Sequence, residues 1–79
     1  MKAKYILFTD DDTESGMDRV VIFDTIQRHA DVARALEVKP FSAGFITLAI
    51  EISCWGEATS LGLKSHPDDD THITRLLSL

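Results

Sequence analysis

The feature that most constrains the fold of this chain is an alternation of apolar with small or polar side chains over residues 46–54. Every second side chain in this range is apolar: Ile46, Leu48, Ile50, Ile52 and Cys54. Because successive side chains of a β-strand point to opposite faces, the alternation predicts a half-buried strand. Residues 45–55 would then form one strand about 36 Å long. We favour one strand, bulged if necessary, over a hairpin because residues 49–51 include no preferred turn former.

Two further strands and a helix are predicted ahead of this segment. Residues 4–9 and 19–23 are rich in β-branched and aromatic side chains, and the connection between them is too short for a crossover. We therefore expect an antiparallel hairpin. Residues 25–37 place apolar side chains at helical spacing, with Asp24 as a capping residue and Pro40 as a stop.

Turn and capping residues divide the carboxyl-terminal part of the chain. Gly56 and Glu57 suit a turn into a last strand over residues 59–63, and Ser65 can start a second helix. The order ββαββα predicts one α+β domain over residues 1–79. We expect two layers, an antiparallel sheet of about four strands with two helices on one face. The other face would meet solvent or a second copy, giving a monomer or a homodimer.

Charge and composition exclude some classes of function. The 79 residues carry a net charge of −5, and the eight Lys and Arg residues are scattered. Binding to phosphates needs clustered positive charge, so we expect no direct nucleic-acid binding and favour a basic protein as the partner of an acidic surface. Glu51 interrupts the longest apolar run, which is too short to span a membrane. A single Cys and no secretory signal indicate a cytoplasmic location.

An acidic loop offers the weaker alternative of a divalent-metal site. Asp10, Asp12 and Glu14 alternate like the first oxygen ligands of a calcium loop. The match ends there, because the glycine is one place late at Gly16 and Val21 stands where the bidentate glutamate belongs. We favour a solvated hairpin loop and expect no cofactor.

Cys54 is the only candidate nucleophile, and the sequence gives it little support. A thiol nucleophile or a metal site would need an imidazole nearby, and the chain has His29, His66 and His72. The spacing forms neither a known metal motif nor a catalytic pair. Cys54 falls on the apolar face of its strand and His29 on the apolar side of the helix, so we interpret both as packing residues.

The turn after the alternating segment is the first candidate for partner recognition. Trp55 and Glu57 flank Gly56 and could place an aromatic face beside a carboxylate, with Thr59 following. Exposed aromatic residues are enriched at interaction hot spots. The competing interpretation is that Trp55 caps the core beneath the second helix.

Three sequence stretches carry a family resemblance. With HADVARAL at residues 29–36, SAGF at residues 42–45 and CWGEATSLGLKS at residues 54–65, the chain resembles small uncharacterised proteins encoded in bacteriophage and prophage genomes. The resemblance implies a setting, and it supplies no catalytic or binding residues to carry over. Small acidic phage proteins often bind host proteins, so by analogy it favours a binding role.

The leading prediction is a non-enzymatic protein-protein interaction module that acts through an acidic surface and the Trp55 turn, in the phage or prophage setting that the resemblance implies. The alternative is a small-ligand or metal-binding module that uses the Asp10 to Glu14 loop or a pocket between helix and sheet. A thiol enzyme that uses Cys54 is the least favoured.

Overall fold

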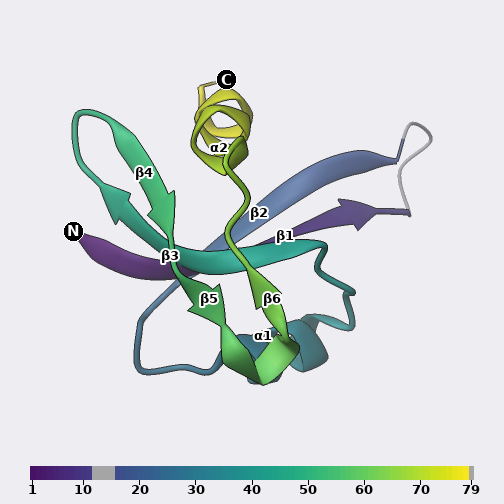
Figure 1. The fold of residues 1–79 in the computed structure, drawn as a ribbon. Helices are drawn as coiled ribbons and strands as arrows, with labels where there is room; N and C mark the ends of the chain where they lie inside the picture. Colours follow the sequence, from purple (N-terminus) through teal and green to yellow (C-terminus); the bar gives the residue numbers. More distant parts are fainter. Residues whose placement is uncertain (12–15, 79) are drawn as a thin grey trace.

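The computed structural model describes residues 1–11 and 16–78. It confirms the α+β class and the antiparallel four-stranded sheet, in which the strands lie in the order β2-β1-β3-β4 (Figure 1). The strands of this sheet are β1 (Lys2–Asp10), β2 (Met17–Phe23), β3 (Ser42–Leu48) and β4 (Ile52–Trp55). The remaining elements are α1 (His29–Leu36), β5 (Glu57–Ala58), the 3₁₀ turn η1 (Thr59–Leu61), β6 (Leu63–Lys64) and α2 (Asp69–Leu77).

The prediction that residues 45–55 form one strand is wrong, because the chain reverses after β3 and returns as β4. Leu48 lies directly opposite Ile52, and Ile46 lies opposite Cys54. Opposite residues of an antiparallel pair project to the same face, so a turn with an odd number of residues preserves the alternation that one long strand would show. The alternation predicts the face of each side chain correctly and says nothing of the chain direction.

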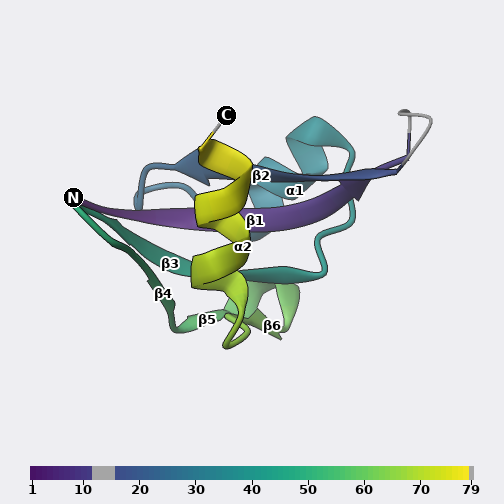
Figure 2. The same cartoon turned by 90° about the horizontal axis from the view of Figure 1, so that it is seen from above.

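The two helices lie on opposite faces of the sheet, so the predicted two-layer arrangement with both helices on one face is wrong (Figures 1 and 2). On β1, Tyr5 and Leu7 point toward α2, whereas Ile6 and Phe8 belong to the core beneath α1. All four side chains are buried. An uninterrupted run of buried side chains is typical of a strand that is covered on both faces, and one layer of helices could not bury it.

Helix α1 starts later than the predicted range 25–37. The Ile26 N–H donates a hydrogen bond to Asp24 Oδ1 (3.0 Å), so this carboxylate closes a turn ahead of the helix instead of capping it. At the other end the Val38 N–H donates to the Ala33 carbonyl (3.0 Å), which closes the helix with a C-terminal capping motif.

A short two-stranded ribbon of β5 and β6 replaces the predicted strand over residues 59–63. Glu57 pairs with Lys64 and Ala58 with Leu63, with η1 between the two strands. Ala58 is buried and Leu63 packs against the core beneath α1. The ribbon therefore covers part of the α1 face and leaves the part near the start of β1 open.

Candidate functional site

Four side chains, one from each strand of the sheet, form a row across the α1 face. Phe23 lies opposite Lys4, Lys4 opposite Phe45, and Phe45 opposite Trp55. Directly opposite residues project to the same face, and Phe23 packs against the core beneath α1. Because β4 is an edge strand, Trp55 ends the row, and no described strand of the sheet lies beyond it.

The outer end of this row combines stacked rings with two ammonium groups. The rings of Phe45 and Trp55 are stacked, with centroids 4.9 Å apart and planes inclined by 17°. Lys2 Nζ lies 5.1 Å from the Trp55 ring centroid and 5.4 Å from that of Phe45, and Lys4 Nζ lies 5.9 Å from the Phe45 centroid. These distances are within the range of cation-π attraction. We name Lys2, Lys4, Phe45 and Trp55 the aromatic-lysine patch.

The indole of Trp55 is fixed in place and yet remains 41% exposed. Its Nε1–H donates to Thr47 Oγ1 at 3.3 Å. Gly56, which follows it, has a φ of 82°, and a Cβ atom there would lie 2.8 Å from Phe45 Cδ2. Only glycine allows this turn to press against the stack. The interpretation that Trp55 caps the core beneath the second helix is wrong, because it lies on the face opposite α2.

His29 supports the patch from α1. It is buried, and its ring makes edge contacts with Phe23 (centroids 5.4 Å apart) and Phe45 (6.1 Å). Its Nε2–H donates to the Gly44 carbonyl at 2.8 Å. Burial lowers the pKa of His29, which favours the neutral ring with its proton on Nε2. These contacts agree with the predicted packing role.

Two of the three predicted partner-binding residues line a small cavity beside the patch. Glu57 and Thr59 are both exposed, and they border a cavity of about 130 Å³. Its other lining residues are Lys4, Arg28, His29, Phe45 and Ser60. Trp55 does not line the cavity, but Phe45, on which its ring stacks, does. The structure thus brings the predicted residues together around Phe45, which the sequence analysis did not single out.

The aromatic-lysine patch is locally basic although the chain has a net charge of −5. Over residues 1–11 and 16–78, no carboxylate forms an ion pair with Lys2 or Lys4. Lys4 Nζ instead donates to the Gln27 carbonyl at 2.7 Å. The acidic surface expected from composition and the surface at Trp55 are therefore different surfaces.

A buried carboxylate that the sequence analysis missed joins the sheet to α2. Helix α2 begins at Asp69, later than the start predicted near Ser65, and Asp69 is 4% exposed. Its Oδ2 accepts hydrogen bonds from the Tyr5 and Ser42 hydroxyls and from the His66 N–H (3.0 Å). Burial, with the bond to Asp69, raises the pKa of the Tyr5 phenol. The network is enclosed, so we assign it to the architecture of the fold.

Cys54 is surrounded by groups that oppose thiolate formation. Burial, together with the neighbouring Asp70 and Asp69 carboxylates, raises the pKa of the thiol to about 12. A reactive cysteine needs the reverse, a lowered pKa in an electropositive setting. Two of the histidines considered as partners interact elsewhere, since His29 bonds to Gly44 and His72 Nε2 lies 3.1 Å from Asp18 Oδ2.

The predicted metal site is only partly within the structure. Asp10 is described, and its Oδ2 forms an ion pair with Arg19 Nε at 2.7 Å. Asp12 and Glu14 lie outside the described residues. Within the described part of the chain, no group of three or more His, Cys, Asp or Glu side chains could hold a metal ion.

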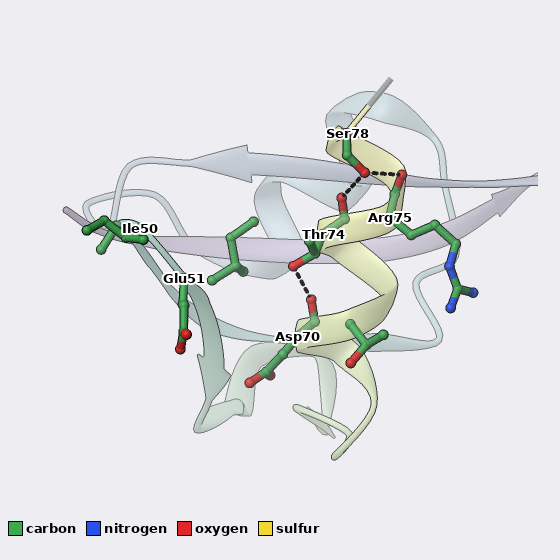
Figure 3. Close-up of a pocket in the computed structure, with 9 residues that line it drawn as sticks. Ile50, Glu51, Asp70, Thr74, Arg75 and Ser78 are labelled. Carbon is green, nitrogen blue, oxygen red and sulfur yellow. Dashed lines mark hydrogen bonds between the residues drawn. The ribbon is translucent and has the colours of Figure 1, made fainter.

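A groove of about 710 Å³ lies between α2 and the turn that joins β3 to β4 (Figure 3). Ile50 and Glu51 border it from the turn, α2 contributes Asp70, Thr74 and Arg75, and Ser78 follows the end of the helix. The hydroxyls along α2 bond within the helix: Thr74 Oγ1 donates to the Asp70 carbonyl (2.7 Å), and Ser78 Oγ to the Thr74 carbonyl (2.8 Å). Few polar groups of the groove therefore converge on a possible ligand.

Comparison with protein-family models, with curated proteins and with solved structures gives no match. The resemblance to phage and prophage proteins therefore stays a prediction. Of the helices in the described ranges, none is long and apolar enough to cross a membrane.

Proposed function

We propose that this chain is a small non-enzymatic protein-protein interaction module, and that the aromatic-lysine patch is its binding surface, with Glu57 and Thr59 at its border. The observation that carries the proposal is a rigid, half-exposed Trp55 at the end of a stacked row. Tryptophan is among the residues that contribute most to binding energy at protein interfaces.

The contacts of Trp55 support binding because they order the indole before a partner arrives. Ordering a mobile side chain at an interface costs about 0.5 to 1.5 kcal/mol. The stack on Phe45, the hydrogen bond to Thr47 and the close approach of Gly56 already restrict this ring. Less of the interaction energy with a partner is then lost to ordering.

The charge of the patch favours a partner that presents carboxylates. Lys2 and Lys4 lie beside the rings without a described acidic partner. A carboxylate that approaches the patch would meet two ammonium groups at a partly desolvated position. The basic partner expected from the net charge would have to bind elsewhere on the molecule. The single cysteine supports the cytoplasmic location expected from the sequence, because thiols are kept reduced in that compartment.

The test of this proposal is quantitative capture of host proteins by the intact chain and by three variants. Trp55→Ala removes the exposed indole, and Ile50→Ala removes a fully exposed apolar side chain on the β3-β4 turn, away from the patch. We expect a captured protein to be lost with Trp55→Ala and kept with Ile50→Ala. Lys2→Glu should weaken the same interaction. Captured proteins that are retained equally by both alanine variants would contradict the proposal.

The groove beside α2 supports a second candidate function, the binding of a small ligand. Its volume of about 710 Å³ is within the range of ligand pockets, which usually enclose about 300 to 1,000 Å³. A thermal-shift screen with metals, nucleotides and apolar acids tests it, since a ligand at a hundred times its Kd stabilises a protein by about 2.7 kcal/mol. The same screen tests the Asp10 to Glu14 loop for calcium. Shifts that persist in Trp55→Ala would favour this second candidate.

A further inference from the structure

The backbone groups at the edges of the sheet can be assigned from one pair of hydrogen bonds. The Leu48 N–H donates to the Met1 carbonyl (2.7 Å), and the Met1 amine donates to the Leu48 carbonyl (3.0 Å). In an antiparallel pair such mutual bonds recur at every second residue. The odd-numbered residues of β1 therefore bond to β3, and the even-numbered residues bond to β2.

It follows that β2 alternates between bonded and outward backbone groups. Val21, which lies opposite Ile6, bonds inward to β1. The N–H and C=O groups of Asp18, Val20 and Ile22 point away from the sheet. Within residues 1–11 and 16–78, none of these outward groups has a hydrogen-bond partner.

The opposite edge of the sheet is shorter and is closed by a side chain. There β4 has four residues, against seven in β2. The outward N–H of Cys54 donates to Asp70 Oδ1 of α2 at 3.0 Å. An uncovered edge strand offers a row of donors and acceptors to another chain, and proteins commonly block such edges. Of the two edges, β2 is the longer, and no described side chain bonds to its outward backbone groups.

Side chains on both faces of β2 are also incompletely covered. Val20 and Ile22 pack against the core beneath α2 together with Leu76, and all three are only partly buried. Val21 and Phe23 are partly buried against the core beneath α1. One more strand beyond β2 would cover both sets, because its side chains would alternate between the same two faces.

The charges at the two ends of this edge select the occupant. Asp18 lies at one end with the exposed Asp11 in the adjoining loop, and the exposed Asp24 follows the other end. Thr9 Oγ1 and His72 Nε2 already contact the Asp18 carboxylate, and the one cation of the strand, Arg19, is paired with Asp10. A second copy paired antiparallel would bring these carboxylates toward one another, and each copy carries a net charge of −5. A segment with Lys or Arg at its ends would instead meet acids at both ends, whichever way it runs.

We propose that the β2 edge binds an extended segment of a partner protein, with an apolar, β-branched centre and basic residues at both ends, which adds to the sheet as a further strand. This mode of recognition takes its affinity from backbone hydrogen bonds and its specificity from alternate side chains. The surface is separate from the aromatic-lysine patch, so one molecule could hold an acidic and a basic partner region together.

The test uses a synthetic peptide of about nine residues with valine alternating with threonine in the centre and lysines at both ends. Amide exchange is followed by NMR on the isotope-labelled full chain. At about ten times its Kd the peptide should slow exchange of the Asp18, Val20 and Ile22 amides about tenfold. The Val21 amide, bonded in the free protein, should change little. A peptide with the same centre and glutamates at its ends should bind about tenfold more weakly.

Two variants separate edge pairing from other modes of binding. Val20→Pro removes an outward N–H that makes no internal bond, so the fold is retained while peptide binding is lost. Asp24→Lys makes one end of the edge basic and leaves the acids at the other end, so the preference for the peptide with lysine ends should largely disappear. This variant also removes the acceptor of the Ile26 N–H in the turn ahead of α1, so its fold is checked by the same NMR spectra. Trp55→Ala should leave the binding of both peptides unchanged.

Unchanged exchange at the three outward amides with either peptide would overturn the proposal, and so would equal binding of the two peptides. Protection of these amides that rises with protein concentration in the absence of peptide would assign the edge to a second copy of the chain instead.

Discussion

The two faces of the sheet differ in how far their functional groups are buried. On the α2 face, Asp69 is drawn into the interior and accepts hydrogen bonds from Tyr5 and Ser42. On the α1 face, the row of rings runs out past the helix and ends at a half-exposed Trp55. On the α2 face the buried polar groups are enclosed and hydrogen-bonded, whereas on the α1 face the last ring of the row is left partly exposed to solvent.

This difference suggests how stability and binding are divided in a small domain. When a buried network loses one member, the remaining groups lose hydrogen bonds that water cannot replace, which lowers the free energy of unfolding. When an exposed ring is removed, water fills most of the space, so little stability is lost. Substitutions on the α2 face should therefore lower the free energy of unfolding, whereas those at the end of the α1 face should mainly affect association.

The largest losses of stability are expected on the α2 face, where Asp69→Ala tests the buried network. This substitution would remove the acceptor that the Tyr5 and Ser42 hydroxyls and the His66 N–H share, and we expect the free energy of unfolding to fall by about 3 kcal/mol. The hydroxyls could then donate only to their other acceptors, Ser65 Oγ for Tyr5 (2.8 Å) and the Lys64 carbonyl for Ser42 (3.3 Å). Asp68→Ala is the matched control, because Asp68 is exposed and its side chain makes no capping hydrogen bond; it should change stability by less than about 0.5 kcal/mol. Urea unfolding measures both. Equal losses would remove the distinction between the two faces.

Next in size is Gly56→Ala, which tests the packing behind Trp55. The added Cβ would lie 2.8 Å from the Phe45 ring, at a φ of 82° that favours glycine. We expect a loss of about 2 kcal/mol. Gly62→Ala has a similar φ of 67° with no atom within 4 Å of the new Cβ, so it should cost only about 1 kcal/mol. If the two variants unfold at the same urea concentration, the contact with Phe45 contributes nothing.

A smaller loss of stability is expected for Trp55→Ala. The stack with Phe45 contributes about 0.5 to 1.5 kcal/mol, and the indole is already 41% exposed. Ile73→Ala on the α2 face removes a fully buried side chain and should cost about 2 to 5 kcal/mol, so the pair compares the two faces directly. A Trp55→Ala protein that loses as much stability as Ile73→Ala would mean that Trp55 belongs to the core.

The effect that is smallest near neutral pH is a pH dependence of stability that Cys54 contributes on the α2 face at alkaline pH. Burial raises the pKa of its thiol from an ordinary value near 9 to about 12. Between these values the folded state keeps a proton that the unfolded chain has lost, so stability falls as the pH rises through this range. Cys54→Ala should flatten that decline. The decline that remains should be reduced by Tyr5→Phe, because burial also raises the pKa of the phenol.

Local sequence signals predicted the strands near the amino terminus and a turn at Gly56, but they left open whether Trp55 is exposed and did not predict the arrangement of the elements. The hairpin of β3 and β4 was missed because a turn with an odd number of residues leaves the side-chain alternation intact. The opposite placement of the helices was missed although Tyr5, Ile6, Leu7 and Phe8 form an apolar run in the sequence. Such a run indicates burial on both faces.

The composition of the candidate site depends on strand register, which single-residue patterns do not report. Lys4 and Phe45 join Trp55 because β1, β3 and β4 pair in one particular register. Lys2 reaches the rings from a position that shares no sequence motif with them. Asp69 is one of three successive aspartates, and only the helix geometry distinguishes the buried one.

The most direct test of the central claim uses the single tryptophan of the chain as its own reporter. Acrylamide quenching of Trp55 fluorescence is measured in the free protein and in the complex with a captured partner. The account predicts ready quenching in the free protein and strong protection, with a blue-shifted emission, in the complex. Equal quenching in the two states would contradict it and would show that the partner binds at another surface.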